Sequence, residues 1–181
     1  SYNNIMDADA ALELIMEFEQ PGCVILKHSN PCGAAQGTSL AEAYVTAFAV
    51  DPTSAFGGIV GFNRTIDAAT AEEIGKAFTE VVIAPDYTAE ALAILEQKKN
   101  VRLLKVADIL KGNAAKQGGL YTRKVAGGLL LQERDLGCAD LDAAQVVTTR
   151  KPTADEMEAL KFAWRICKYV KSNAIVYADK N

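Results

Sequence analysis

The chain has 181 residues, of which half are hydrophobic, 23% are charged and one is histidine. This composition is typical of a soluble α/β-type domain that closes a core without disulfides or metals, and it excludes disorder, collagen-like repeats and a coiled coil. Nineteen Lys and Arg against 23 Asp and Glu give a formal net charge of −4. A mildly acidic chain lacks the basic surface that nucleic acids and anionic membranes attract, so we predict neither as a partner.

No apolar run reaches the roughly 18 to 20 residues of a membrane-spanning helix, and the N-terminal SYNNIMDADA lacks the blocks of a signal peptide. We therefore expect a cytoplasmic protein. None of the cysteines has C-x-x-C spacing, so we expect free thiols, two of which (Cys23 and Cys167) belong to the core. The four cysteines are Cys23, Cys32, Cys138 and Cys167.

The first third of the chain predicts two helices on either side of a strand. Asp7 is the expected N-cap of a helix through about residue 19, because apolar residues follow it at helical spacing. Residues 23–27 (CVILK) predict a buried strand, and residues 28–37 predict a loop of small and polar residues. Ser39 and Glu42 form a capping box for a helix through about residue 49. The apolar face of the first helix comprises Ala11, Leu14, Ile15 and Phe18.

The middle of the chain alternates between strand and helix patterns. Residues 51–58 (DPTSAFGG) predict a turn-rich loop. One helix is expected to open at Thr70 with Glu73, and another to span Thr88–Lys98. The expected strands are residues 58–63, 80–85 and 101–106.

The last third begins with residues 107–119, where the pattern weakens and indicates a surface excursion. Thr153 and Glu156 form a capping box for the longest helix, through about residue 170. Three strands are also expected: residues 121–132 with an interruption at Gly127-Gly128, residues 146–150, and residues 174–179. The predicted apolar face of the long helix comprises Leu160, Ala163, Trp164, Cys167 and Val170.

Strands that alternate with helices of this length predict a three-layer α/β/α domain with a largely parallel or mixed sheet. The chain contains no internal repeat and no linker. It begins at Ser1 rather than Met, and it stops two residues after the last expected strand, so we expect a piece of a longer protein.

The end of the first strand is the first place to look for chemistry. In open α/β sheets ligands bind beyond the carboxyl ends of strands, which selects the loops after residues 23–27, 58–63 and 80–85. Lys27 and His28 end the first of these strands. An ammonium group can hold a phosphate or a developing oxyanion, and an imidazole beside it can accept a proton near neutral pH. The structural alternative is a surface lysine followed by a loop-capping histidine.

The loop also has a partial likeness to a metal site. His28-x-Asn30-Pro31-Cys32 is similar to the H-x-E and P-C-x-x-C signature of zinc deaminases, compressed into one segment. That chemistry needs a His, two thiolates and a Glu that shuttles protons. Asn30 stands in the place of the Glu and Ala35 in that of the second Cys, so we expect no zinc.

Three further positions allow a functional and a structural interpretation. Gly57 lets a ligand approach the backbone near the hydroxyls of Thr53 and Ser54, or it simply serves a turn into the next strand. The segment is not a P-loop. Glu80 hydrogen-bonds a ligand, or its carboxylate reaches water. Asn173 follows the last helix, where it can terminate the final turn.

Four stretches, in order, resemble a known family: residues 24–35 (VILKHSNPCGAA), 51–64 (DPTSAFGGIVGFNR), 82–85 (VIAP) and 170–178 (VKSNAIVYA). They are similar to bacterial AICAR transformylase, the formyltransferase part of a bifunctional purine enzyme whose other part is IMP cyclohydrolase. The resemblance runs from Ser1 to Asn181. It implies that residues 1–181 form the first of two cytidine-deaminase-like α/β/α lobes, with the second lobe and the cyclohydrolase domain absent.

The resemblance also implies an activity, namely transfer of a formyl group from 10-formyltetrahydrofolate to the 5-amino group of AICAR, giving FAICAR. His28 matches the family's proton acceptor, and Lys27 matches the residue that stabilises the transition state. Gly57, Glu80 and Asn173 match positions that contact the nucleotide. The implied partners are AICAR, the folate co-substrate and a second copy in a full-length homodimer; the residues that contact the folate are not implied.

Two other function classes remain open. A metal-dependent, deaminase-like hydrolase needs thiolates that this loop lacks, and stoichiometric zinc in the purified protein would support it. A non-catalytic lobe that folds or dimerises without chemistry is the second alternative, because the absent half supplies part of the composite site in this family. We expect the fragment by itself to be inactive.

Overall fold

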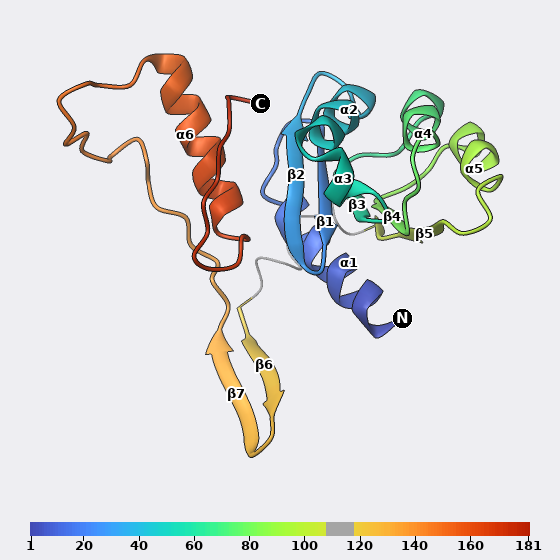
Figure 1. The fold of residues 1–181 in the computed structure, drawn as a ribbon, viewed down its shortest axis with the longest axis horizontal. Coiled ribbons are helices and arrows are strands. Elements are labelled where there is room, and N and C mark those ends of the chain that lie inside the picture. Colours follow the sequence, from blue (N-terminus) through green and yellow to red (C-terminus); the bar gives the residue numbers. More distant parts are fainter. Residues whose placement is uncertain (108–117) are drawn as a thin grey trace.

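The computed structural model describes residues 1–107 and 118–181, with a five-stranded sheet at its centre (Figure 1). The strand order is β2-β1-β3-β4-β5. β1 runs antiparallel to β2 and β3, whereas β3, β4 and β5 are parallel, so the predicted mixed sheet is confirmed. The strands are β1 (Gly22–Lys27), β2 (Asn30–Gln36), β3 (Ile59–Phe62), β4 (Val81–Ala84) and β5 (Arg102–Lys105).

Helices cover both faces of the sheet, which confirms the three-layer α/β/α architecture. One core cluster joins the strands to α2, α4 and α5, and a second joins them to α1 and to part of α6. Side chains of β1 alternate between the clusters: Cys23 and Ile25 pack in the first, Val24 and Leu26 in the second. The helices are α1 (Tyr2–Ile15), α2 (Leu40–Val50), α3 (Pro52–Ala55), α4 (Ala68–Ile74), α5 (Ala89–Leu95) and α6 (Ala154–Cys167).

Two helices begin at other residues than predicted. α1 starts after Ser1, whose hydroxyl accepts from the backbone of Asn4, so Asp7 lies inside the helix and does not cap it. α4 is capped by Asp67, whose carboxylate accepts from Thr70 N at 2.9 Å, so the predicted start at Thr70 is wrong. A cap needs an extended backbone at its own position, which depends on how the chain enters the helix and not on spacing. The four residues of the predicted apolar face are all buried, but α1 ends at Ile15 and not near residue 19, so the last of them lies beyond the helix: Ala11, Leu14, Ile15 and Phe18.

The other predicted caps are formed. The capping box of α6 is complete, with Thr153 and Glu156 each bonded to the other's backbone. Ser39 caps α2, but the carboxylate of Glu42 accepts from Thr38 N at 2.8 Å, so the predicted box is only half formed. Thr88, the expected first residue of the next helix, caps α5, which ends at Leu95 and not at Lys98.

The segment expected as a loop at residues 28–37 is a strand for most of its length. β2 follows β1 after a two-residue turn, so that Lys27 lies opposite Asn30. The expectation was wrong because Gly, Pro and Ala are depleted in strands. Here small residues serve packing: α2 lies so close to β2 that a Cβ atom on Gly33 would be 2.1 Å from the carbonyl oxygen of Ala47.

The strand expected at residues 121–132 is in fact two strands. β6 (Leu120–Val125) and β7 (Gly128–Glu133) form an antiparallel hairpin, with Val125 opposite Gly128. Of the predicted interruption, Gly127 lies in the two-residue turn and Gly128 begins β7. Figure 1 shows the hairpin extending away from the main sheet. Three consecutive leucines of β7 are exposed: Leu129, Leu130 and Leu131.

Two other expected strands are not formed. Residues 146–150 and 174–179 have no strand pairing, and Tyr177 is 94% exposed. One backbone hydrogen bond joins the tail to the sheet, in which Gln36 N donates to Asn181 O at 2.8 Å. An apolar run becomes a strand only where a neighbour offers a row of backbone donors and acceptors, and within the described part of the chain these segments have no such neighbour.

α6 buries a different face from the one predicted, and it ends three residues earlier. Phe162 and Ile166 are buried, and the ring of Phe162 stacks on Phe18 with a centroid distance of 5.6 Å. Leu160 and Trp164 of the predicted face remain 55% and 52% exposed. A helix with more than one apolar stripe buries the stripe that meets a partner surface, which here includes Phe18, three residues after α1.

Two segments between the regular elements, residues 51–58 and 107–119, were also subjects of prediction. Residues 51–58, expected as a loop, contain the single turn α3, whose cap Asp51 accepts from Ser54 N at 2.9 Å. The excursion predicted for residues 107–119 falls almost wholly outside the described residues. In residues 1–107 and 118–181, no helix combines the length and apolarity that a bilayer crossing requires.

We predict that Gly33→Ala lowers the free energy of unfolding by about 1–3 kcal/mol, because the added methyl group collides with the α2 backbone. Chemical denaturation followed by circular dichroism measures this change. Gly128→Ala is the matched control, since an added Cβ there meets nothing within 4 Å, and it should shift stability by less than about 0.5 kcal/mol. Equal stabilities of the two variants would contradict the close approach of α2 to β2.

Candidate functional site

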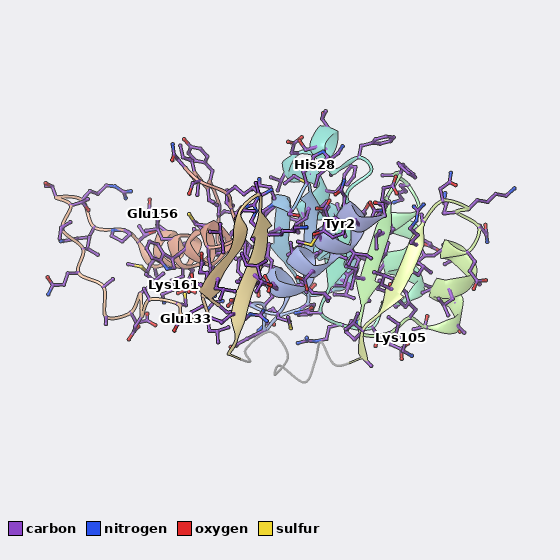
Figure 2. All side chains as sticks on the ribbon, turned by 90° about the horizontal axis from the view of Figure 1, so that it is seen from below. Tyr2, His28, Lys105, Glu133, Glu156 and Lys161 are labelled. Carbon is purple, nitrogen blue, oxygen red and sulfur yellow. The ribbon has the colours of Figure 1, made fainter. Side chains whose placement is uncertain are left out.

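Lys27 and His28 lie where β1 ends and the chain turns back into β2. His28 and Ser29 form the turn, and both have left-handed backbone, with φ of 56° and 55°. Two positive φ values are the pattern of a type I′ hairpin turn, which favours Asn and Gly, because this conformation costs other residues about 1–2 kcal/mol each. His28 is exposed, and Figure 2 shows it well separated from Glu133 of β7 and Lys161 of α6.

Asp7 holds this turn from the second turn of α1. Its Oδ2 accepts from His28 N at 3.1 Å, and its Oδ1 accepts from the hydroxyl of Ser29 at 2.7 Å. Asp7 was expected to cap a helix, so this contact was not predicted. No local signal could have found it, because the partners are 21 and 22 residues apart in the chain.

The ammonium group of Lys27 reaches the loop that precedes β3. Its Nζ donates to the carbonyl oxygen of Phe56 at 2.9 Å, and the side chain is half-buried. Gly57 follows with φ of 70° and donates its N–H to Phe78 O at 2.8 Å. The structure therefore brings Lys27 to the Gly57 loop. The positive φ is a sufficient structural reason for glycine at this position.

The loops that meet at this edge of the sheet are not the ones expected. Because β1 is antiparallel to β3 and β4 is parallel to it, the end of β1 lies beside the starts of β3 and β4. The loops that follow β3 and β4 lie at the opposite edge, so the expected convergence of three carboxyl-terminal loops is wrong. Glu80, directly before β4, joins the edge that holds Lys27: its N–H donates to Gly58 O at 3.1 Å, and its carboxylate pairs with Arg102 at 2.8 Å.

The segment after α6 approaches the same turn. Lys171 Nζ donates to His28 O at 2.5 Å, and Lys171 N donates to Asn30 Oδ1 at 3.0 Å. Asn173 is exposed two residues further on. The structure thus gathers Lys27, His28, Gly57 and Glu80 at one sheet edge, with the segment that carries Asn173 beside the turn.

The turn does not offer the donors of a deaminase-type zinc site. The thiol of Cys32 donates to Ile25 O at 3.3 Å. Burial, and next the charge of Asp51, raise the pKa of Cys32 to about 11, so the thiolate that zinc binds is disfavoured at neutral pH. Ala35 has no ligating atom. Within the described residues, His, Cys, Asp and Glu side chains form no group of three or more that could hold a metal ion.

All four cysteines are free thiols in the structure. Cys23 is buried in the core, as predicted, and burial raises its pKa well above the ordinary value. Cys167 is half-buried and lies at the rim of a pocket, so its assignment to the core is only partly right. Cys138 is exposed.

These environments predict an order of thiol reactivity. At about pH 8, iodoacetamide should label Cys138 first and Cys32 and Cys23 much more slowly, because a raised pKa leaves little of the reactive thiolate. Raising the pH toward about 11 should accelerate Cys32. Peptide mass spectrometry over time measures the rates. Similar labelling of Cys32 and Cys138 near neutral pH would contradict the described burial.

A pocket of about 470 Å³ lies away from this edge, between α1, the hairpin and the end of α6. Glu13 lines it and accepts from Arg134 at 2.6 Å and from the hydroxyl of Tyr121. None of the predicted site residues lines this pocket. Sequence reasoning missed it because these partners are more than 100 residues apart in the chain. Glu17 likewise accepts hydrogen bonds from two residues far away in the chain, the Tyr169 hydroxyl and the Lys168 ammonium.

The fold and the site together define a three-layer α/β/α lobe that carries a lysine and a histidine at the end of an interior strand. Comparison with known proteins then identifies the family. Residues 1–181 match the family described as the AICARFT/IMPCHase bienzyme, and the chain belongs to this family.

Two relatives illustrate the similarity, both named bifunctional purine biosynthesis protein PurH. The chain is 56% identical to the protein of Rhizobium leguminosarum bv. trifolii (strain WSM2304) and 58% identical to that of Chelativorans sp. (strain BNC1). Each alignment has 181 residues and covers 98% of this chain and 33% of the relative. The chain therefore spans about a third of the length of the curated relatives it matches.

Proposed function

We propose that this chain is the first lobe of an AICAR transformylase and carries part of the site that transfers a formyl group from 10-formyltetrahydrofolate to AICAR. The observation that carries the proposal is the position of Lys27 and His28. They are adjacent at the end of β1, and the Lys27 ammonium lies against the backbone of the Gly57 loop at 2.9 Å. The family match over residues 1–181 supports the same reaction.

The chemistry explains why a base and a cation belong together. The amine of an aminoimidazole carboxamide is a poor nucleophile, and it must lose a proton as it attacks the formyl carbon. In this proposal the His28 imidazole accepts that proton. The Lys27 ammonium stabilises the negative charge that develops on the formyl oxygen and assists departure of the folate nitrogen.

The position of Lys27 suits this role. An ammonium group has three donors, and within the described residues only the Phe56 carbonyl takes one of them. The other N–H bonds can point to a substrate oxygen while the Phe56 contact keeps the side chain in place. Gly57, Glu80 and Asn173 are proposed to contact the nucleotide. The Glu80 carboxylate forms an ion pair with Arg102. To contact the nucleotide, it must bind Arg102 and the ligand together or give up the ion pair.

The rest of the site is proposed to come from outside this chain. The relatives are about three times as long, and we propose that a second lobe and a second copy of the protein complete the site in a cytoplasmic homodimer. The exposed leucines of β7 are apolar surface that such a lobe would cover. The non-catalytic alternative applies if this lobe binds no nucleotide, which a calorimetric titration of the chain with AICAR tests.

We predict that the 181-residue chain by itself shows no measurable formyl transfer, because the donor is not held against the amine. Such positioning accounts for about 7–11 kcal/mol of barrier lowering. A chimera, in which this chain replaces the matching third of a full-length bifunctional relative, should be active. Spectrophotometric detection of tetrahydrofolate release measures the formyl-transfer rate of the isolated chain and of the chimera. Transfer by the isolated chain at the rate of the chimera would show that one lobe holds a complete site.

In the chimera, His28→Ala and Lys27→Ala should each lower kcat by about 10²- to 10³-fold with little change in the KM for nucleotide, since both groups act mainly in the transition state. Steady-state kinetics at saturating folate separates the two parameters. Lys161→Ala, on α6 and away from the turn, is the control. Near-normal kcat for both site variants would remove these residues from catalysis.

A further inference from the structure

The backbone of His28 is held from two distant parts of the chain. Its N–H donates to Asp7 of α1, and its carbonyl accepts from Lys171, which follows α6. At the outside of a two-residue hairpin turn, neither group has a partner in the strand ladder. The two side chains therefore satisfy the backbone groups that the turn leaves unpaired.

The neighbours of His28 are held by the same two residues. Asp7 accepts the Ser29 hydroxyl at 2.7 Å, and the Lys171 backbone donates to Asn30 at 3.0 Å. Both central residues of the turn have positive φ, which a non-glycine residue maintains only where its surroundings impose it. The imidazole is the part of His28 that these contacts leave exposed.

We infer that Asp7 is a positioning residue, which acts through the His28 turn to aim the imidazole, with Lys171 as the second arm of the same clamp. The inference rests on the proposed function, in which His28 accepts the proton of the attacking amine. A proton acceptor works only within hydrogen-bond reach of its substrate, and a misplacement of about 1 Å can cost about 10²-fold in rate. The Asp7 carboxylate binds both central residues of the turn, so its loss is expected to misplace the His28 imidazole.

The kinetic test uses the chimera. Asp7→Ala should lower kcat by about 10- to 100-fold while the KM for nucleotide changes by less than about threefold. Asp7→Asn keeps an oxygen that accepts from His28 N and an amide that donates to the Ser29 hydroxyl, so it should restore kcat to within about threefold of the unaltered chimera. Asp9→Ala is the matched control: it is an exposed acid of the same helix with no hydrogen bond to the turn in the described residues.

A second readout does not depend on activity. His28 is the only histidine of the chain, so its signals are readily assigned by NMR in the 181-residue protein. Hydrogen exchange of the His28 amide should be faster by about tenfold or more in Asp7→Ala and nearly unchanged in Asp7→Asn and Asp9→Ala. Circular dichroism confirms that each variant is folded. If Asp7→Ala does not fold, Lys171→Ala, which alters an exposed side chain, tests the other arm with the same expected loss of kcat.

The outcomes separate this inference from the proposed function. A normal kcat for folded Asp7→Ala, together with a large loss for His28→Ala, overturns the positioning role and leaves the proposed function intact. An equal loss in Asp7→Ala and Asp7→Asn also overturns it, because the conservative variant preserves the hydrogen bonds. If His28→Ala keeps full activity, the proposed role of His28 fails, and the positioning role fails with it.

Discussion

The two-residue turn between β1 and β2 is the constraint on which the rest of the site depends. β1 is an interior strand with core on both faces, so Val24 and Ile25 fix which way each side chain points. A slip of one residue would move every side chain to the opposite face. The register that buries these residues therefore also places Lys27 opposite Asn30 and His28 at the tip of the turn. Core packing thus determines the position of the two groups to which we assign chemistry.

The direction of β1 decides what surrounds that turn. Since β1 is antiparallel to β3 and β3 is parallel to β4, the end of one strand meets the beginnings of two others. Gly57 and Glu80 precede their strands and yet share an edge with Lys27, which is the last residue of its own strand. The reversed strand replaces the usual arrangement, in which loops at the carboxyl ends of parallel strands converge.

α1 connects this edge to the parts of the chain that come last in the sequence. Asp7 binds the His28 turn from the second turn of the helix, and Glu13 binds Arg134 at the base of the hairpin from the last turn. The buried face of the helix packs against the sheet between these contacts. Because one rigid helix carries both polar contacts, the segments after residue 118 are tied to the same element that shapes the turn.

The sequence by itself determined the alternation of helices and strands, the central strand at residues 23–27, the buried face of the first helix, and Lys27 and His28 as the residues to examine. Those features follow from local periodicity and capping, which neighbouring residues decide. Only the tertiary structure decided that the Pro- and Gly-containing segment after His28 is a strand, that Asp7 holds a turn and does not cap a helix, and that α6 buries Phe162 and leaves Trp164 exposed. Each of these depends on a partner far away in the chain, such as α2 against Gly33 or Phe18 against Phe162. A residue's own spacing carries no information about which surface will meet it.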